Sequence, residues 1–291
     1  MKIKFSATTD TGLVRDNNED AVSVCPDLSC QEWILEDTAS YLPIGTYGAM
    51  MVVADGMGGA NAGEIASSIV INTVKSYFTK DRLQRGFLGE QSIHGMLAEA
   101  VSLSQDAIMD YVQKNPNSNG LGTTVVITWV MNSTAYIAWC GDSRTYCYNP
   151  KSGLKRLTKD HSYVQELMDR GELTSKQAFN HPDSNIITKC LGDVDMLCEP
   201  DFVKYEIGAG DILLSCSDGL CGYCKDKDIE KIMMLSFDNL SHCKTNLLKL
   251  ALNAGGQDNI TIALCATLPD DESTPIISCK TRIKRLLERL V

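Results

Sequence analysis

Aspartates stand at the ends of several short apolar runs in this chain, each beside a glycine or within a glycine-containing turn. Asp55 follows the apolar run 49–54, Asp218 follows the run 211–217, Asp142 follows the run 134–141, and Asp258 lies just before the run 260–264. A short apolar run bounded by a turn signal is typical of a buried strand. The pattern therefore predicts that these carboxylates lie at strand ends, where a ligand can reach them.

The chemistry of such a group depends on whether the strand ends meet. Carboxylates that collect in one place repel one another, and cations relieve that repulsion. Oxygen ligands with no histidine or thiolate among them suit Mg²⁺ or Mn²⁺ rather than Zn²⁺. Gly56, next to Asp55, lets backbone approach whatever the carboxylate holds. Asp-Gly is also ordinary turn chemistry, but its recurrence favours a cation site.

The composition is that of an ordinary globular protein. The chain has 291 residues, enough for one large domain or two small ones, with 44% hydrophobic and 22% charged residues. Its net charge of −10 argues against nucleic acid as a partner. It has no apolar run of membrane-spanning length, and its N-terminal residues have no apolar stretch of signal-peptide length. We therefore expect a cytoplasmic protein without a membrane span.

The cysteine usage also favours a reducing compartment. Twelve cysteines are scattered through the chain, and several fall inside apolar runs, where they act as small hydrophobic residues. Cys221 and Cys224 have the spacing of a metal or redox pair, but a second pair at zinc-site distance is lacking. A metal or redox role for this pair is the less favoured interpretation.

Hydrophobic periodicity predicts a mixture of strands and helices. Strands are expected at 3–7, 21–25, 49–54, 122–130, 134–141, 144–148, 201–207, 211–217 and 260–266. Helices are expected at 62–79, 91–113, 161–170, 226–235 and 242–253. Residues 26–46 are expected as a loop, and 171–190 as a mobile excursion from the core. Residues 267–278 resemble a linker, and 280–291 are amphipathic; we expect that helix to pack on its own domain rather than on a partner or membrane.

Seven short motifs, taken in order, resemble those of the protein phosphatase 2C (PPM) family, in its bacterial branch. The resemblance spans about residues 3–268. The motifs are Gly12-Leu13-Val14-Arg15 with Asn18-Glu19-Asp20, Asp55-Gly56-Met57-Gly58-Gly59, Gly122-Thr123-Thr124, Gly141-Asp142-Ser143-Arg144, Leu157-Thr158-Lys159-Asp160-His161-Ser162, Ser217-Asp218-Gly219-Leu220 and Gly256-Gln257-Asp258-Asn259. Each motif alone is weak, and their order makes the resemblance specific.

The resemblance implies an α+β fold, a four-layer α-β-β-α sandwich in which two packed antiparallel sheets are flanked by helices. It implies a phosphatase domain at 1–268, with a flap near 162–190 that borders the site. Residues 269–291 would then be a linker and an amphipathic C-terminal helix. As a hypothesis, the flap gates access to the site and so tunes kcat.

The resemblance also implies an activity, the hydrolysis of phosphoserine and phosphothreonine in proteins. Two Mg²⁺ or Mn²⁺ ions, with a third in bacterial members, would activate the attacking water. The partners would be phosphorylated proteins, substrates of a serine/threonine kinase, and we expect the chain to be a monomer. Site roles carried over by motif are the following: Asp55 bridges both ions, Gly56 binds one through its carbonyl, Asp218 and Asp258 bind the other, Glu19 and Asp20 act through waters, Asp142 with Asp218 holds the third ion, and Arg15 binds phosphate.

One departure from the family pattern leaves the proton donor open. Many eukaryotic members have histidine at the position of Met57, and methionine cannot donate a proton. The general acid would then be a metal-bound water or His161, although a lone histidine that opens a helix is more often structural. The catalytic residues that the resemblance implies are Arg15, Asp55 and Asp218, and His161 is a candidate general acid.

Two other functions remain as alternatives. A catalytically inactive relative could bind phosphoproteins or a signalling partner, but it should lack ligands, and Asp55, Asp142, Asp218, Asp258 and Arg15 are all present. A related hydrolase could act on a phosphorylated anti-sigma-factor antagonist, with a partner protein supplying the sensor.

Overall fold

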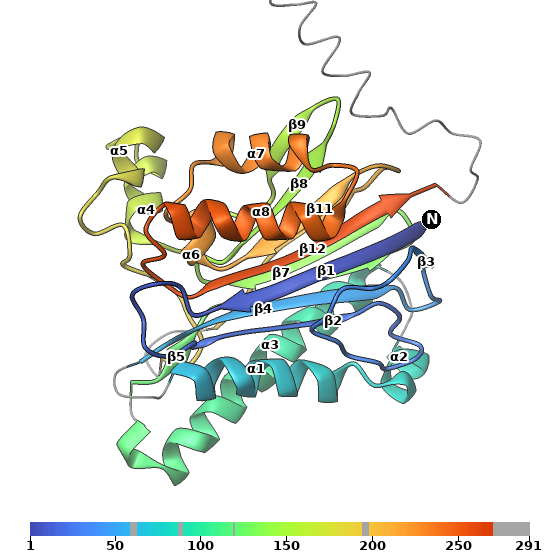
Figure 1. Ribbon diagram of the computed structural model, residues 1–291. Coiled ribbons are helices and arrows are strands. Elements are labelled where there is room, and N and C mark those ends of the chain that lie inside the picture. The colour runs from blue at the N-terminus through green and yellow to red at the C-terminus, as the bar shows by residue number, and fades with distance from the viewer. Residues whose placement is uncertain (59–62, 87–89, 119, 194–197, 270–291) are drawn as a thin grey trace, which may run out of the picture.

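The computed structural model describes residues 1–58, 63–86, 90–118, 120–193 and 198–269, and it contains two antiparallel β-sheets packed face to face (Figure 1). The first sheet has the order β3-β1-β12-β11-β8-β9, with β1 Lys2–Asp10, β3 Leu42–Pro43, β8 Arg144–Asn149, β9 Gly153–Arg156, β11 Ile212–Cys216 and β12 Ile260–Leu268. The second has the order β10-β7-β6-β4-β2, with β2 Asp20–Cys25, β4 Ala49–Met57, β6 Val125–Met131, β7 Thr134–Cys140 and β10 Asp201–Glu206. The short β5, Gly122–Thr123, pairs with the end of β4.

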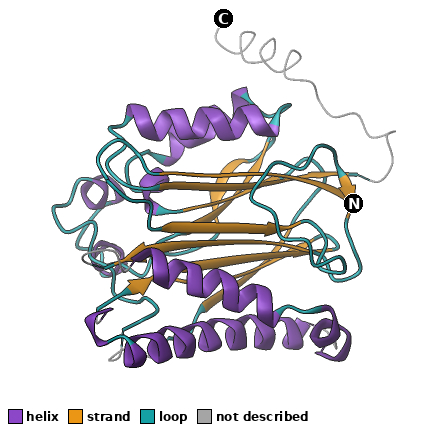
Figure 2. Ribbon diagram, turned by 60° about the horizontal axis from the view of Figure 1, so that its bottom comes forward, coloured by secondary structure: helices purple, strands orange, loops and turns teal. Residues whose placement is uncertain are grey.

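Helices cover the outer face of each sheet, which gives four layers (Figure 2). The second sheet is covered by α1 Gly63–Tyr77 and α3 Glu90–Lys114, with α2 Lys80–Gly86 between them in the chain. The first is covered by α6 Asp218–Cys221, α7 Asp226–Leu235 and α8 Leu240–Asn253. None of the helices in the described ranges is long and apolar enough to cross a membrane.

Strand β4 explains why the chain forms layers. Because successive side chains of a strand point to opposite faces, its apolar run fills two cores at once. Met50, Val52 and Ala54 lie in the core beneath α1 and α3. Ala49, Met51 and Val53 lie in the core between the sheets. A third core joins the outer face of β11 and β12 to α7 and α8. A strand buried on both faces therefore appears in the sequence as a continuous apolar run.

The part of the chain that connects β9 to β10 forms a smaller unit at one end of the sandwich. It contains α4 Tyr163–Asp169, whose N-cap is Ser162, and α5 Ser175–Phe179, whose N-cap Thr174 forms a capping box with Gln177. An isolated bridge between Ser162 and Ile187 closes this unit at its base. It occupies the position predicted for the flap.

The predicted α+β sandwich is confirmed, whereas several boundaries were wrong. Strand β4 continues through Asp55 to Met57, because Gly56 and Met57 pair with β5, so Asp55 is not the last strand residue. The strand predicted at 122–130 is divided into β5 and β6. Residues 171–190 contain α5, and His161 precedes the N-cap of α4 instead of opening a helix. The elements α2, α6, β3, β9 and the 3₁₀ turn Pro116–Ser118 were not predicted. The predicted helix at 280–291 lies outside the described residues.

Candidate functional site

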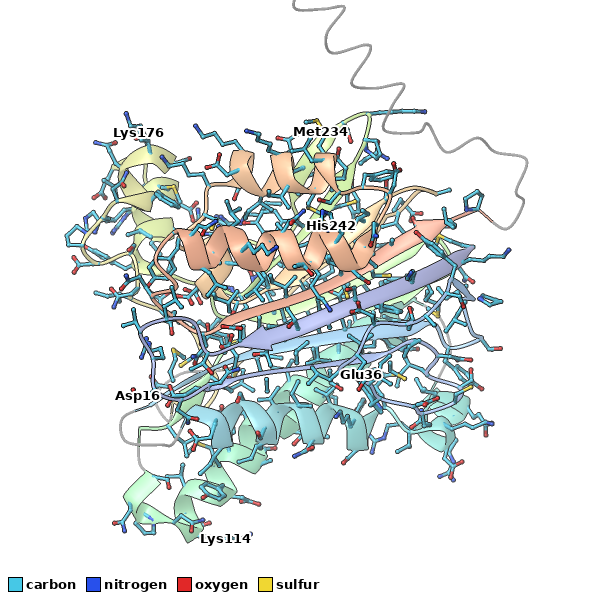
Figure 3. The ribbon with its side chains drawn as sticks, in the orientation of Figure 1. Asp16, Glu36, Lys114, Lys176, Met234 and His242 are labelled. Atoms are coloured by element: carbon cyan, nitrogen blue, oxygen red, sulfur yellow. The ribbon has the colours of Figure 1, made fainter. Side chains whose placement is uncertain are left out.

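Strand pairing brings the predicted carboxylates to one end of the sandwich. Asp20 is directly opposite Asp55 in the antiparallel pairing of β2 with β4. Asp218 directly follows Ser217 after β11, and Asp258 comes just before β12, which pairs with β11. Asp142 lies two residues beyond the end of β7. Figure 3 shows Asp16, in the loop that carries Arg15, and Lys176 of α5 at this same end.

The carboxylates form one electrostatic group. Burial is the main cause that raises the pKa of Asp20 to about 7 and that of Asp218 to about 6. Burial likewise raises the pKa of Asp55 and Asp142 well above its usual value. Repulsion adds to burial in each case, and for Asp55 the repelling charges are the other four acids of the group, namely Asp20, Asp218, Asp142 and Asp258. Five carboxylates in one site are therefore costly to ionise together without counter-charge.

Within the described part of the chain, two of these acids carry a buried oxygen without a protein hydrogen bond. Asp20 is 8% exposed and Asp142 is 7% exposed, and in each the Oδ1 atom has no partner among the described residues. The other oxygen of Asp20 accepts a hydrogen bond from Ser217 at 2.7 Å. Buried polar atoms are normally paired, so these oxygens point to a partner that is not a protein group.

The donor set fits a hydrated Mg²⁺ or Mn²⁺ better than a closed metal cage. Among the described residues, no three His, Cys, Asp or Glu side chains come together as a ready-made ion site. This finding contrasts with the strong repulsion between the carboxylates. However, Mg²⁺ commonly keeps several waters and takes only one or two carboxylates from the protein. The two observations therefore agree if waters complete the shell. Among the described residues the main charges that act on Asp55 are all aspartates, a donor set unlike that of a typical zinc site.

Asp55 and Gly56 are held by the neighbouring β5 segment. The Asp55 amide donates to Thr124 Oγ1 at 3.1 Å, and the Asp55 carbonyl accepts from the Thr124 amide at 2.8 Å. The Gly56 amide donates to the carbonyl of Glu19 at 3.2 Å. A Cβ on Gly56 would overlap the carbonyl oxygen of Gly63 at the start of α1, so only glycine fits here.

Arg15 lies at the rim of the carboxylate group, in the loop between β1 and β2. Its Nη2 atom is 2.8 Å from Asp258 Oδ2, and its side chain is 52% exposed. The loop is fixed by a hydrogen bond from the Leu13 amide to the Gly256 carbonyl at 2.7 Å. Gly12 has φ +79°, and a Cβ there would overlap the Asp258 carbonyl. Arg15 is thus positioned between the acids and solvent.

Asn259 is a site residue for which the sequence predicted no role. Its Nδ2 atom donates to the carbonyls of Thr11 and Asn17 at 3.0 and 2.9 Å, and its Oδ1 accepts from the Glu19 amide at 2.7 Å. One side chain therefore ties the loop that carries Arg15 and Glu19 to the segment that carries Asp258. Its position in the Gly-Gln-Asp-Asn motif was the available signal.

Arg144 and Asp160 form a second group that was named in motifs without a role. Arg144 donates to both oxygens of Asp160, at 2.7 Å from Nη2 to Oδ2 and 2.9 Å from Nε to Oδ1. Arg144 also donates to the carbonyl of Cys221 at 3.2 Å. Its positive charge opposes the rise in pKa of Asp142 and Asp218. Arg144 is therefore the buried counter-charge behind the carboxylates.

His161 contacts the frame of the site. Its Nδ1 accepts from the Gly141 amide at 3.0 Å, and its ring is stacked on Trp139, with 6.1 Å between ring centroids. Its Nε2 is 3.3 Å from Asp201 Oδ1, a contact that lacks hydrogen-bond geometry. Burial, followed by the charge of Lys189, lowers the pKa of His161, so the ring is neutral near pH 7. These contacts fix the turn that carries Asp142.

A cavity of about 390 Å³ lies between the flap and α6–α8. Phe179 of α5 and Tyr223 both line it, and the ammonium of Lys225 lies 5.6 Å from the Phe179 ring centre. The pKa of Tyr223 is raised by burial and then by the charges of Asp218 and Asp258, so this ring adjoins the carboxylates. The cavity is therefore next to the site.

The Cys221 and Cys224 pair is part of the apolar core beneath α7 and α8. Burial raises the pKa of Cys224 to about 12, and the Cys221 thiol donates to the Ser217 carbonyl at 3.4 Å. Within the described residues neither thiol belongs to a group of metal-type ligands. The less favoured metal interpretation gains no support.

The sequence of this chain is similar to those of known phosphatases. Residues 36–251 match the family model described as Protein phosphatase 2C. The chain is 33% identical over 256 residues to serine/threonine phosphatase stp of Listeria monocytogenes, which covers 88% of this chain and 92% of that protein. It is 31% identical over 280 residues to serine/threonine protein phosphatase PstP of Mycobacterium tuberculosis, which covers 96% of this chain. The match spans 48% of PstP, about half of its length.

The fold agrees with solved structures of these relatives. A crystal structure of the PstP catalytic domain in complex with two manganese ions superposes with a TM-score of 0.72 at 29% identity, covering 92% of this chain and 99% of that one. The likeness in sequence to PstP covers 280 of the 291 residues, so it includes the loops that carry Arg15 and Asp258 as well as the core. The chain belongs to the protein phosphatase 2C family.

Proposed function

We propose that this chain is a Mg²⁺- or Mn²⁺-dependent phosphatase that hydrolyses phosphoserine and phosphothreonine in proteins. The observation that carries the proposal is the group of buried, mutually repelling carboxylates with Arg15 at its rim. The relatives named serine/threonine phosphatases support the activity, and the PstP catalytic domain in complex with two manganese ions supports the cofactor.

Seven residues would hold the ions. Asp55 and the carbonyl of Gly56 would act with Asp218 and Asp258 as direct ligands, Glu19 and Asp20 would act through water, and Asp142 would join Asp218 at a third position. When bound, the ions supply positive charge and lower the pKa of a water toward neutrality. The unpaired Oδ1 atoms of Asp20 and Asp142 support their inclusion in this set.

Two arginines of the chain have different roles in this proposal: Arg15 binds the phosphate, and Arg144 offsets the charge of the acids. The planar guanidinium of Arg15 can take two phosphate oxygens at once, and the exposed side chain can reach an incoming phosphoprotein. Phosphoryl transfer asks little covalent chemistry of the protein, so placement and charge neutralisation dominate. Arg144 offsets part of the charge of Asp142 and Asp218 from behind, which opposes the rise in their pKa, and the bound ions would supply the remaining positive charge.

For His161 we propose a positioning role instead of the proton-donor role considered above. Its Nδ1 is engaged by Gly141, its ring is stacked on Trp139, and its Nε2 faces Asp201. A general acid needs a free path from a ring nitrogen to the leaving oxygen. These contacts support fixing the Gly141–Asp142 turn and leave the proton to solvent at the site.

Asp55→Asn and Asp218→Asn test the proposal. We expect each variant to lose hydrolysis of p-nitrophenyl phosphate and of a phosphothreonine peptide in Mn²⁺, by about a hundredfold or more, because a ligand charge is removed. The fold should persist, because removing one of several repelling charges relieves strain in the site. Circular dichroism and thermal melting check the fold. Substantial activity in both folded variants would refute the ligand assignment.

The same assay separates the proposal from its alternative. Mn²⁺-stimulated hydrolysis by the unmodified chain supports an enzyme, whereas phosphopeptide binding without hydrolysis supports an inactive, phosphoprotein-binding regulator. We further propose that the substrates are made by a serine/threonine kinase and that the chain acts as a monomer in a reducing cytoplasm. Eleven cysteines of the described residues are free thiols, which suits such a compartment. We also propose that the phosphatase domain ends where β12 ends, at Leu268.

A further inference from the structure

Two thiols meet beside the site, and neither takes part in the proposed mechanism. Cys140 is the last residue of β7, and Cys198 lies three residues before β10, which pairs with β7. Their Sγ atoms are 3.5 Å apart. A disulfide has sulfurs about 2.05 Å apart, so a small movement would join them.

The two thiols differ in access and in acidity. Cys140 is fully buried, whereas Cys198 is partly exposed. The hydrogen bond between the two sulfurs, aided by the nearby Lys189, lowers the pKa of Cys198. Because Cys140 is buried, Cys198 is the thiol that a small oxidant meets first, and its lowered pKa favours the more reactive thiolate form. Cys190 is a neighbour whose pKa burial raises to about 11, and Cys198 reaches its carbonyl oxygen at 3.8 Å.

We propose that Cys140 and Cys198 form a site of reversible oxidation, at which hydrogen peroxide converts the two thiols into a disulfide. The Cys198 thiolate attacks one peroxide oxygen, the O–O bond breaks, and the departing hydroxide takes a proton to give water and a sulfenic acid. The Cys140 sulfur then attacks the Cys198 sulfur, the S–O bond breaks, and a second water leaves with the Cys140 proton. The thiols lose two electrons and the peroxide gains them, and a dithiol reductant reverses the change.

The disulfide would act on the site through the backbone. Cys140 directly precedes the Gly141–Asp142 turn, and His161 holds that turn through the Gly141 amide. Drawing Cys140 toward Cys198 moves the start of this turn and with it Asp142. A displacement near 1 Å can cost as much as a hundredfold in rate, so we expect oxidation to lower activity by about tenfold. This effect on rate rests on the proposed function, whereas formation of the disulfide does not.

The test follows the bond and the activity separately. The reduced chain is treated with hydrogen peroxide, the remaining thiols are alkylated, and the chain is digested without reductant for mass spectrometry. We expect a linked peptide pair that contains Cys140 and Cys198, and loss of p-nitrophenyl phosphate hydrolysis that dithiothreitol restores. Cys198→Ser and Cys198→Ala should show no link and keep their activity in peroxide.

Cys30→Ser is the matched control, because Cys30 is an exposed thiol hydrogen-bonded to Asp27 and is far along the chain from the pair. It should form the link as the unmodified chain does. Separate alkylation of Cys140 and Cys198 after peroxide, or a link from Cys198 to Cys190, would overturn the proposal. A link that leaves hydrolysis unchanged would overturn the effect on the site. A reduced chain without hydrolysis that still forms the link would refute the proposed function alone.

Discussion

The positive charge of Arg15 lies at the rim of the carboxylate group. The hydrogen bond with Asp258 is the main cause that raises its pKa, and Glu19 contributes by charge. Because half of the Arg15 side chain is exposed, its ion pair with Asp258 adds little to the free energy of unfolding. The main effect of the pair is to orient the guanidinium for phosphate binding. A phosphate that arrives at the site meets a planar donor whose orientation is already fixed by Asp258.

Arg15→Lys tests this role at the residue level. Lysine keeps the charge but cannot offer two parallel N–H groups, so we expect KM for a phosphothreonine peptide to rise about tenfold, with a smaller change in kcat. Steady-state kinetics in saturating Mn²⁺ measure both constants. Arg82→Lys is the control, since Arg82 is also half exposed and pairs with Glu99 at 3.2 Å on the α1–α3 side. Equal effects of the two substitutions would contradict a phosphate role for Arg15.

The Arg144–Asp160 pair should instead govern stability. The Asp160 side chain is 7% exposed and accepts from Arg144 and from Arg156, at 2.7 and 2.6 Å, so its removal takes the nearest carboxylate from two largely buried positive charges. For Asp160→Ala we expect a loss of about 3 kcal/mol in the free energy of unfolding, measured by urea titration.

A surface ion pair provides the comparison for Asp160. Lys159 and Asp169 lie 2.6 Å apart, but both side chains are largely exposed. Asp169→Ala should therefore leave the urea midpoint unchanged. An Asp160→Ala midpoint that is equally unchanged would show that solvent, and not the buried pair, satisfies Arg144.

The residues of the site were partly predictable from sequence. Asp55, Asp142, Asp218 and Asp258 were named because residue type and local spacing carry the signal, whereas Arg15 and Asp20 were named only through the resemblance of their motif to the family. The roles of Asn259, Arg144 and Asp160 were not predicted, because each depends on partners that are distant in the chain. Asn259 donates to Thr11, 248 positions away, and nothing local to either residue indicates that contact.

At the scale of elements, prediction succeeded where one face or both faces are buried. Helix α7 was predicted with its observed bounds, and α1, α3 and the central strands were placed within a few residues. The failures are short or marginal elements. Helix α5 has five residues and is started by its capping box, whereas its apolar periodicity is too short to detect. Strand β5 exists because β4 continues past Asp55 to pair with it.

The flap element makes its own prediction through Phe179. This ring lines the cavity beside Tyr223, at the end of the molecule where the carboxylates lie. A phosphopeptide extends beyond the phosphate, whereas p-nitrophenyl phosphate does not. For Phe179→Ala we therefore expect kcat/KM for the peptide to fall about fivefold while the small substrate is unaffected, as for loss of one apolar contact.

Leu103→Ala is the control for Phe179, because Leu103 is a partly exposed apolar side chain of α3, on the opposite helical layer. Leu103→Ala should leave kcat/KM unchanged for both the peptide and p-nitrophenyl phosphate. Removal of residues 171–184 should exaggerate the difference between the two substrates. Unchanged kinetics on both after that deletion would count against any role of the flap in access.

For the whole molecule, the two sheets must be aligned for the acids to meet. Hydroxyl groups buried between the sheets help to fix this alignment: Thr128 of β6 lies 3.1 Å from both Thr145 of β8 and Ser215 of β11. Thr124 lies 2.7 Å from Ser143 nearer the site. Such contacts specify one packing because a shift would leave buried hydroxyls unpaired. Periodicity could predict that each strand is buried, but not which strands are neighbours. The two-sheet sandwich was therefore predicted only through the family resemblance, and the order of the strands was not predicted.

The repulsion among the acids should make the metal-free protein more stable at lower pH. The folded-state pKa is raised above 3.8 to about 7 for Asp20 and about 6 for Asp218, so the folded form binds protons that the unfolded form releases. The free energy of unfolding must then fall as pH rises between these values. His161, whose pKa is lowered from 6.5, acts in the opposite direction, but it is one group against several.

We therefore expect the Tm in EDTA to decrease from pH 5 to pH 8, and Asp218→Asn to flatten that slope. Excess Mg²⁺ should reverse the trend, because cations bind the ionised carboxylates and so stabilise the folded state most at high pH. Calorimetry at constant ionic strength measures all three curves. A Tm that rises with pH in EDTA would mean that the carboxylates do not share one site, and the cation-binding function would lose its physical basis.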